Sequence, residues 1–266
     1  MSDDAEDPAS RFADTAPQYA VYRPEYDNRA YDYLRRRFAL DRESRVLDLG
    51  CGTGRIGVAL APDVGDVVGI DPNEAMITHA RERASVAGVE NTEWWVGSDA
   101  DLPDRAPDLD PLRLTTMGRS FHWMDQERTL RTLHDITEPG GGVAIFGDTE
   151  WVARGTADWQ DEVYGVLTEF LDDPPERTGP VEYDDPWDEK LATHGFGDAE
   201  KVEFETERAW DADGVVGYLL SLSFCSPAVL GEERAAFEEA VRERLAAFGE
   251  PPYEETATVS VIAGER

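Results

Sequence analysis

The length and composition of this chain indicate one folded domain and exclude several other classes of protein. The 266 residues are 41% hydrophobic and the apolar segments recur regularly, which is compatible with a substantial core and excludes a disordered acidic tail. The two cysteines, Cys51 and Cys225, belong to no cluster of cysteines and histidines, so neither a disulfide scaffold nor a metal site is predicted.

The charge of the chain is strongly negative. Asp and Glu number 57 against 25 Lys and Arg, which gives a formal charge of −32, and Lys190 and Lys201 are the only lysines. An acid excess with scarce lysine resembles proteins of salt-loving archaea. In molar salt the Debye length falls to roughly 3 Å, so repulsion between carboxylates is screened. We therefore expect a halophilic protein whose fold is destabilised at low salt.

The first residues of the sequence do not resemble a signal peptide. Residues 2–7 are acidic where a signal peptide needs positive charge. No apolar run approaches the roughly 20 residues that cross a bilayer. We expect a cytoplasmic protein with no membrane partner, in which residues 27–40 form the first regular helix.

Residues 46–57 predict an apolar strand that ends in a glycine turn and opens a helix. Their sequence is Val-Leu-Asp-Leu-Gly-Cys-Gly-Thr-Gly-Arg-Ile-Gly. Glycine is needed where the backbone takes positive φ and approaches a ligand closely. Gly52, Gly54 and Gly57 also fit the dinucleotide pattern, and Asp71 lies about 20 residues after it, where that pattern places a ribose-binding acid. Both NAD and S-adenosylmethionine are therefore candidate cofactors.

Asp48 favours S-adenosylmethionine. A carboxylate at this position would repel a pyrophosphate, whereas S-adenosylmethionine has no phosphate and carries an ammonium and a sulfonium. Residues 47–54, which include this acid and its glycines, resemble the first motif of the class I S-adenosylmethionine-dependent methyltransferases.

Later landmarks agree with this resemblance in their order. Residues 67–71 predict a second strand whose Asp71 binds the ribose hydroxyls, followed by a helix over 73–87. Residues 94–100 predict a third strand, and the resemblance implies that Asp99 at its end lies near the adenine amino group. A turn that resembles the family's Pro-Gly-Gly turn precedes a fifth strand at 143–146. The residues expected to bind the donor are Asp48, Gly50, Cys51, Gly52, Thr53, Gly54, Asp71, Pro72, Met76, Ser98, Asp99, Ala100 and Phe121.

The segment after the predicted fourth strand, 112–117, indicates the acceptor class. Residues 121–125, Phe-His-Trp-Met-Asp, resemble an element of the small-molecule branch often called the type 11 domain, with Asp125 capping the next helix. Residues 118–121 differ from the Asn/Asp-Pro-Pro-aromatic turn typical of base and amide N-methyltransferases, and no basic run is interleaved with aromatics. A small-molecule acceptor is therefore favoured over nucleic acid.

The remaining elements complete a Rossmann-like α/β fold. We expect a doubly wound, mostly parallel sheet of seven strands with an antiparallel last strand and helical cap segments. The single domain, 1–266, is divided into an N-terminal cap (1–40), a cofactor-binding core (41–150) and substrate-side helices with the last strands (151–266). The elements predicted after residue 150 are helices at 158–171, 187–194, 212–224 and 232–248, strands at 201–207 and 256–263, and a loop at 172–186.

The predicted acceptor site rests on a second resemblance. Residues 22–26, Tyr-Arg-Pro-Glu-Tyr, resemble a segment of the branch that contains trans-aconitate methyltransferase. A carboxylate acceptor needs no base, and Arg23 would orient it through a bidentate pair. A phenol or amine would need a base, for which His122 has a suitable pKa range. The residues expected to bind the acceptor are Tyr22, Arg23, Trp123 and Trp151. The alternatives are an NAD-dependent oxidoreductase and a non-catalytic S-adenosylmethionine-binding protein.

Overall fold

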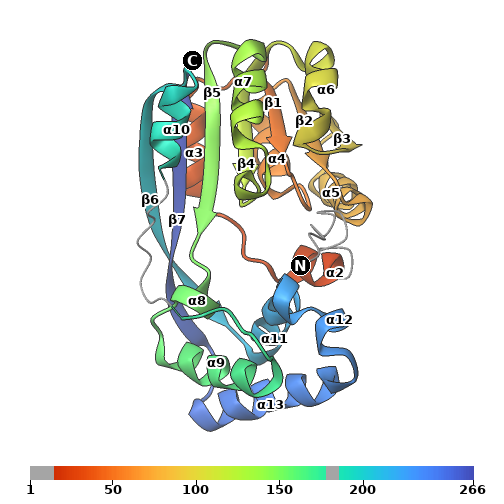
Figure 1. Ribbon diagram of the computed structural model, residues 1–266, viewed down its shortest axis with the longest axis vertical. Coiled ribbons are helices and arrows are strands. Elements are labelled where there is room, and N and C mark those ends of the chain that lie inside the picture. The colour runs from red at the N-terminus through yellow and green to blue at the C-terminus, as the bar shows by residue number, and fades with distance from the viewer. Residues whose placement is uncertain (1–14, 178–185) are drawn as a thin grey trace, which may run out of the picture.

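The protein is built on one seven-stranded sheet, in the order β3-β2-β1-β4-β5-β7-β6 (Figure 1). The computed structural model describes residues 15–177 and 186–266. β7 runs antiparallel to both neighbours, and the other pairings are parallel, which confirms the predicted fold class. The strands are β1 (Arg45–Leu49), β2 (Asp66–Asp71), β3 (Thr92–Val96), β4 (Leu112–Gly118), β5 (Thr137–Asp148), β6 (Gly197–Trp210) and β7 (Tyr253–Glu265).

Helices cover both faces of this sheet because the strands are apolar on both sides. One buried cluster joins the sheet to α6 (Leu102–Leu109), α7 (Gln126–Ile136) and α10 (Trp187–Thr193). Another joins the opposite face to α3 (Asn28–Arg37) and α4 (Arg55–Leu60). A smaller cluster forms where α5 (Glu74–Ala87) packs on Trp94 of β3. The result is a three-layer core that places the carboxyl ends of the parallel strands along one edge.

A separate helical layer lies beyond that edge. It is formed by α8 (Trp151–Arg154), α9 (Asp158–Phe170), α11 (Ala212–Leu220), α12 (Pro227–Leu230) and α13 (Arg234–Phe248), which share their own buried cluster. The long strands β6 and β7 reach from the core into this layer (Figure 1). There Trp210 and Tyr253 join its apolar cluster. The short helix α2 (Ala16–Tyr22) packs against α11 and α5.

Several boundaries differ from those predicted. The last two strands extend well beyond 201–207 and 256–263. Along β6, exposed polar side chains alternate with partly buried ones, which weakens the apolar signal in the sequence. The third strand ends at Val96, since the Ser98 side chain caps a 3-10 turn at Asp99–Asp101. Helices α2 and α6 had not been predicted. The acidic start of the chain and residues 178–185 of the predicted loop lie outside the described residues.

No single helix in the described ranges is both long and apolar enough to span a membrane. One bent pair, Ala212–Leu220 with Ser223–Phe248, reaches that length and composition together, with an angle of 106° between its members.

Candidate active site

The glycine turn after β1 is shaped by three residues with left-handed backbones. Gly50, Gly52 and Gly54 have φ of +68°, +52° and +75°, a region that side chains disfavour. A Cβ on Gly50 would lie 2.4 Å from the Cβ of Ser120, which follows β4. The turn therefore brings the ends of β1 and β4 into close contact.

Asp48 supports this turn from beneath rather than facing the ligand side. It is 1% exposed, because alternate β1 side chains point into the layers beside the sheet. Its Oδ2 accepts a hydrogen bond from the Gly57 amide at 3.0 Å, and its Oδ1 accepts one from the Thr116 hydroxyl at 3.1 Å. Burial raises the pKa of Asp48 to about 7 despite these bonds. The sequence predicted that Asp48 contacts the methyl donor directly. In the structure Asp48 instead fixes the start of α4.

Asp71 ends β2 beside the glycine turn and faces the cavity. Its Oδ2 accepts a hydrogen bond from the Gly52 amide at 2.9 Å, and its Oδ1 accepts one from the Asn73 amide at 2.9 Å. Burial raises its pKa above the usual value. Each carboxylate oxygen keeps a lone pair available for a hydroxyl donor. The position and chemistry of Asp71 therefore fit the predicted ribose contact.

A cavity opens at the carboxyl ends of β1, β2 and β4. The crevice between β1 and β4 is the point where the strand order reverses, which is where doubly wound sheets bind ligands. The residues lining the cavity are Tyr19, Gly50, Gly52, Asp71, Pro72, Asn73, Met76, Ser98, Asp99, Gly118, Arg119, Ser120, Trp123 and Met124.

The cavity brings together about half of the predicted donor residues. Those that line it are Gly50, Gly52, Asp71, Pro72, Met76, Ser98 and Asp99. The others, Asp48, Cys51, Thr53, Gly54, Ala100 and Phe121, do not appear in its lining; Phe121 is fully buried against Trp187. Sequence reasoning missed Asn73 and the segment Gly118–Ser120 as lining residues. The position of that segment after β4, beside the first strand, was the available signal.

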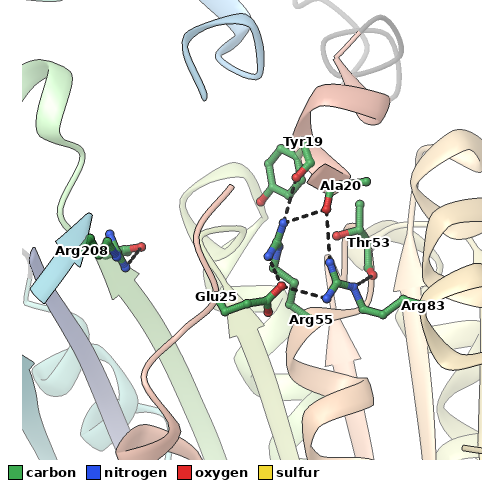
Figure 2. A network of polar contacts seen from close by, with 8 residues as sticks. Tyr19, Ala20, Glu25, Thr53, Arg55, Arg83 and Arg208 are labelled. Carbon is green, nitrogen blue, oxygen red and sulfur yellow. Dashed lines mark hydrogen bonds and ion pairs between the residues drawn. The ribbon is translucent and has the colours of Figure 1, made fainter. Parts of the chain in front are cut away.

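Helix α2 is held over the glycine turn by two arginines (Figure 2). Arg55 donates to the Tyr19 carbonyl at 2.9 Å, and Arg83 donates to the Ala20 carbonyl at 3.4 Å and to the Thr53 carbonyl at 3.1 Å. Both guanidiniums also contact the Glu25 carboxylate. We call these three side chains the α2 clamp. The clamp fixes Tyr19, which lines the cavity.

Of Arg23 and Tyr22, both predicted to bind the acceptor, only Arg23 lies beside this cavity. The Arg23 guanidinium is packed between the rings of Tyr19 and Tyr218, 5.1 Å from each centroid. It lines an adjoining cavity together with Arg119, which borders both spaces. Tyr22 packs against α11, where a Cβ on Gly217 would meet its ring at 2.3 Å.

The remaining predicted residues do not converge on one cavity. Trp123 lines the donor-side cavity and is 51% exposed. Trp151 is buried in the helical layer against Trp159 and Tyr218, so its predicted acceptor contact is replaced by core packing. His122 lines a different hollow, with Arg119 and Glu150, and burial and the charge of Arg119 lower its pKa. Asp125 caps α7 as predicted, by accepting from the Arg128 amide. No cluster of potential metal ligands occurs among the described residues.

Comparison with known proteins identifies the core. Residues 46–141 match the family described as Methyltransferase domain. The protein is a methyltransferase. This family match confirms the expected enzyme class and, with it, S-adenosylmethionine as the cofactor.

One relative and two solved structures illustrate what the methyltransferase is similar to. An uncharacterized methyltransferase-like protein of Schizosaccharomyces pombe is 23% identical over 214 residues, which cover 80% of this chain and 77% of the relative. A putative type II methyltransferase from Anaeromyxobacter dehalogenans has a similar structure, with a TM-score of 0.57, 21% identity, and coverage of 92% and 98% of the two chains. A methyltransferase from Thiobacillus denitrificans, solved with S-adenosylhomocysteine, gives a TM-score of 0.53 with 19% identity over 98% of this chain and 100% of that one.

Proposed function

We propose that this methyltransferase transfers the methyl group of S-adenosylmethionine to a carboxylate of a small organic acid. The observation that carries the acceptor class is an incompletely paired buried cation, Arg23. Its side chain is 10% exposed, its Nε has no hydrogen-bond partner among the described residues, and its bond to the Ser221 carbonyl is long, at 3.4 Å.

A second hydrogen-bond donor in the same cavity also favours an anionic acceptor. The Tyr218 hydroxyl is buried and lacks a hydrogen-bond acceptor within the described ranges, and it lines the cavity with Arg23. Unsatisfied buried donors cost about 1 to 3 kcal/mol each, and more when charged, so a ligand that satisfies both is favoured. A carboxylate accepts from both groups, whereas an amine would add a second cation beside Arg23.

The residues of the donor-side cavity fit the methyl donor. We assign the ribose hydroxyls to Asp71 and the adenine amino group to Asp99, with the backbone at Gly50 and Gly52 permitting close approach. The bound cofactor supplies a methyl carbon activated by positive sulfur. A carboxylate is already an anion and needs no general base, so the chain has to orient it about 3 to 3.5 Å from that carbon and exclude water.

We also propose that the methyltransferase acts in the reducing cytoplasm of a salt-loving organism. Its two buried cysteines are free thiols, and its charge of −32 suits a molar-salt environment. His122 stays a candidate base should the acceptor be a phenol or an amine.

The donor assignment is tested by calorimetric titration of S-adenosylmethionine and of NAD in molar potassium chloride. We expect micromolar binding of S-adenosylmethionine that Asp71→Ala weakens at least tenfold, and no binding of NAD. Asp104→Ala removes an exposed carboxylate outside the cavity and is the matched control. Equal affinity of Asp71→Ala and the control would remove Asp71 from the donor site. Formation of S-adenosylhomocysteine is then screened with carboxylic acids, phenols and amines, and turnover restricted to amines or phenols would reject the carboxylate assignment.

A further inference from the structure

Two of the arginines that line the cavity around Arg23 share one anion, Glu150, which lines the neighbouring hollow. The Arg119 guanidinium lies 2.8 Å from Oε1 of Glu150, and the Arg23 guanidinium lies 3.9 Å from the same oxygen. Burial raises the pKa of Glu150, but Arg119 and Arg23 lower it more, so the side chain is an anion. One carboxylate is thus placed between two guanidiniums.

The other arginines of this cavity are committed to different partners. Arg208 lies 2.9 Å from Asp148 and 3.7 Å from Glu255, and both of these carboxylates are less than 10% exposed. Arg55 belongs to the α2 clamp. An incoming anion is therefore able to replace a carboxylate only at Arg23 and Arg119.

Glu150 is able to leave this place at little structural cost, whereas Arg119 is fixed. The Glu150 side chain is 35% exposed, and although the residue precedes the short helix α8 it makes no capping hydrogen bond. Arg119 has a left-handed backbone with φ of +59°, held by a hydrogen bond from its amide to the Phe146 carbonyl at 3.2 Å. Such a conformation in a residue other than glycine costs energy and is found at functional sites.

We infer that Glu150 determines acceptor specificity by occupying the place between Arg23 and Arg119 that the carboxylate of the acceptor takes on binding. The Glu150 side chain turns toward solvent as the acceptor enters. This inference rests on the carboxylate acceptor proposed above. A neutral molecule gains nothing by displacing Glu150, because it would leave both guanidiniums without an anion. Glu150 therefore discriminates against neutral analogues of the acceptor. It also lowers the apparent affinity for acids, because an acid binds only to the fraction of molecules in which Glu150 has left the site.

The test uses propionate, which has the shape of the glutamate side chain, and its neutral analogue propionamide. Each is titrated calorimetrically into the full chain saturated with S-adenosylhomocysteine, at constant potassium chloride. We expect Glu150→Gln to bind propionate at least fivefold more tightly than the wild type, with no gain for propionamide. The double variant Glu150→Gln/Arg119→Met should lose that gain. Glu239→Gln makes the same change in net charge at an exposed position of α13 and should behave as the wild type.

Three results would overturn the exchange. They are unchanged or weaker propionate binding by a Glu150→Gln protein with wild-type circular dichroism, an equal gain for propionamide, and persistence of the gain in the double variant. Failure of S-adenosylhomocysteine to bind the wild type would instead reject the donor site, and the propionate series repeated without it would still decide the role of Glu150.

Discussion

Asp48 is a buried acid whose ionisation is coupled to folding. Its pKa is about 7 in the folded chain, whereas an aspartate in an unfolded chain ionises near 4. Between these values the folded state binds the extra proton, so the contribution of Asp48 to the unfolding free energy is greatest below pH 4 and falls as the pH rises to 7.

Asn at this position does not titrate, and its amide is able to bond both Gly57 and Thr116. We predict that the wild type loses about 2 kcal/mol of unfolding free energy relative to Asp48→Asn when the pH rises from 5 to 7.5. Urea unfolding in 2 M potassium chloride measures this difference, with Asp104→Asn as the exposed control. A difference independent of pH would contradict the buried-acid assignment.

At the scale of elements, the α2 clamp couples a short helix to the donor-side cavity. Helices of seven residues have little stability alone, so the position of α2 depends on tertiary contacts such as those from Arg83. We predict that Arg83→Ala weakens S-adenosylmethionine binding about fivefold, equivalent to roughly 1 kcal/mol, and increases hydrogen exchange in residues 16–22. Arg81→Ala is the matched control, because Arg81 lies on α5 like Arg83 but donates its hydrogen bond to the Trp94 carbonyl. Equal effects of the two substitutions would show that α2 is held by other contacts.

Much of the arrangement of elements was predictable from the sequence, and the cavity was predictable in part. Glycines and acids at strand ends mark the donor side because backbone geometry demands those residue types locally, and Asp71 and Gly52 are found together as expected. The acceptor side depends on contacts between distant segments. Arg23 meets Tyr218, and Arg119 meets Glu150, across separations that no local pattern encodes. Trp151 was misassigned because an aromatic residue has the same sequence signal in a core as in a binding site.

At the scale of the whole molecule, the charge of −32 opposes folding unless salt screens it. Many arginines are engaged in ion pairs, but 57 acids face only 25 basic residues, so a large negative charge stays uncompensated. We predict that the midpoint of urea unfolding rises steadily between 0.1 M and 2 M potassium chloride, as the Debye length falls from about 10 Å to a few ångströms. Circular dichroism measures the transition, and a repeat at pH 4.5, where some carboxylates are neutral, should show a weaker salt effect. A midpoint independent of salt would contradict the halophilic assignment.

The helical layer is assembled from two segments of chain, one before β6 and one after it. α8 and α9 follow β5, whereas α11 to α13 lie between β6 and β7, yet all of them share one apolar cluster. The two segments therefore have to change together, since an altered side chain on one would lose its packing partner on the other. Hybrid enzymes made by exchanging either segment alone would inherit a mismatched interior, whereas exchange of both would keep the shared cluster intact.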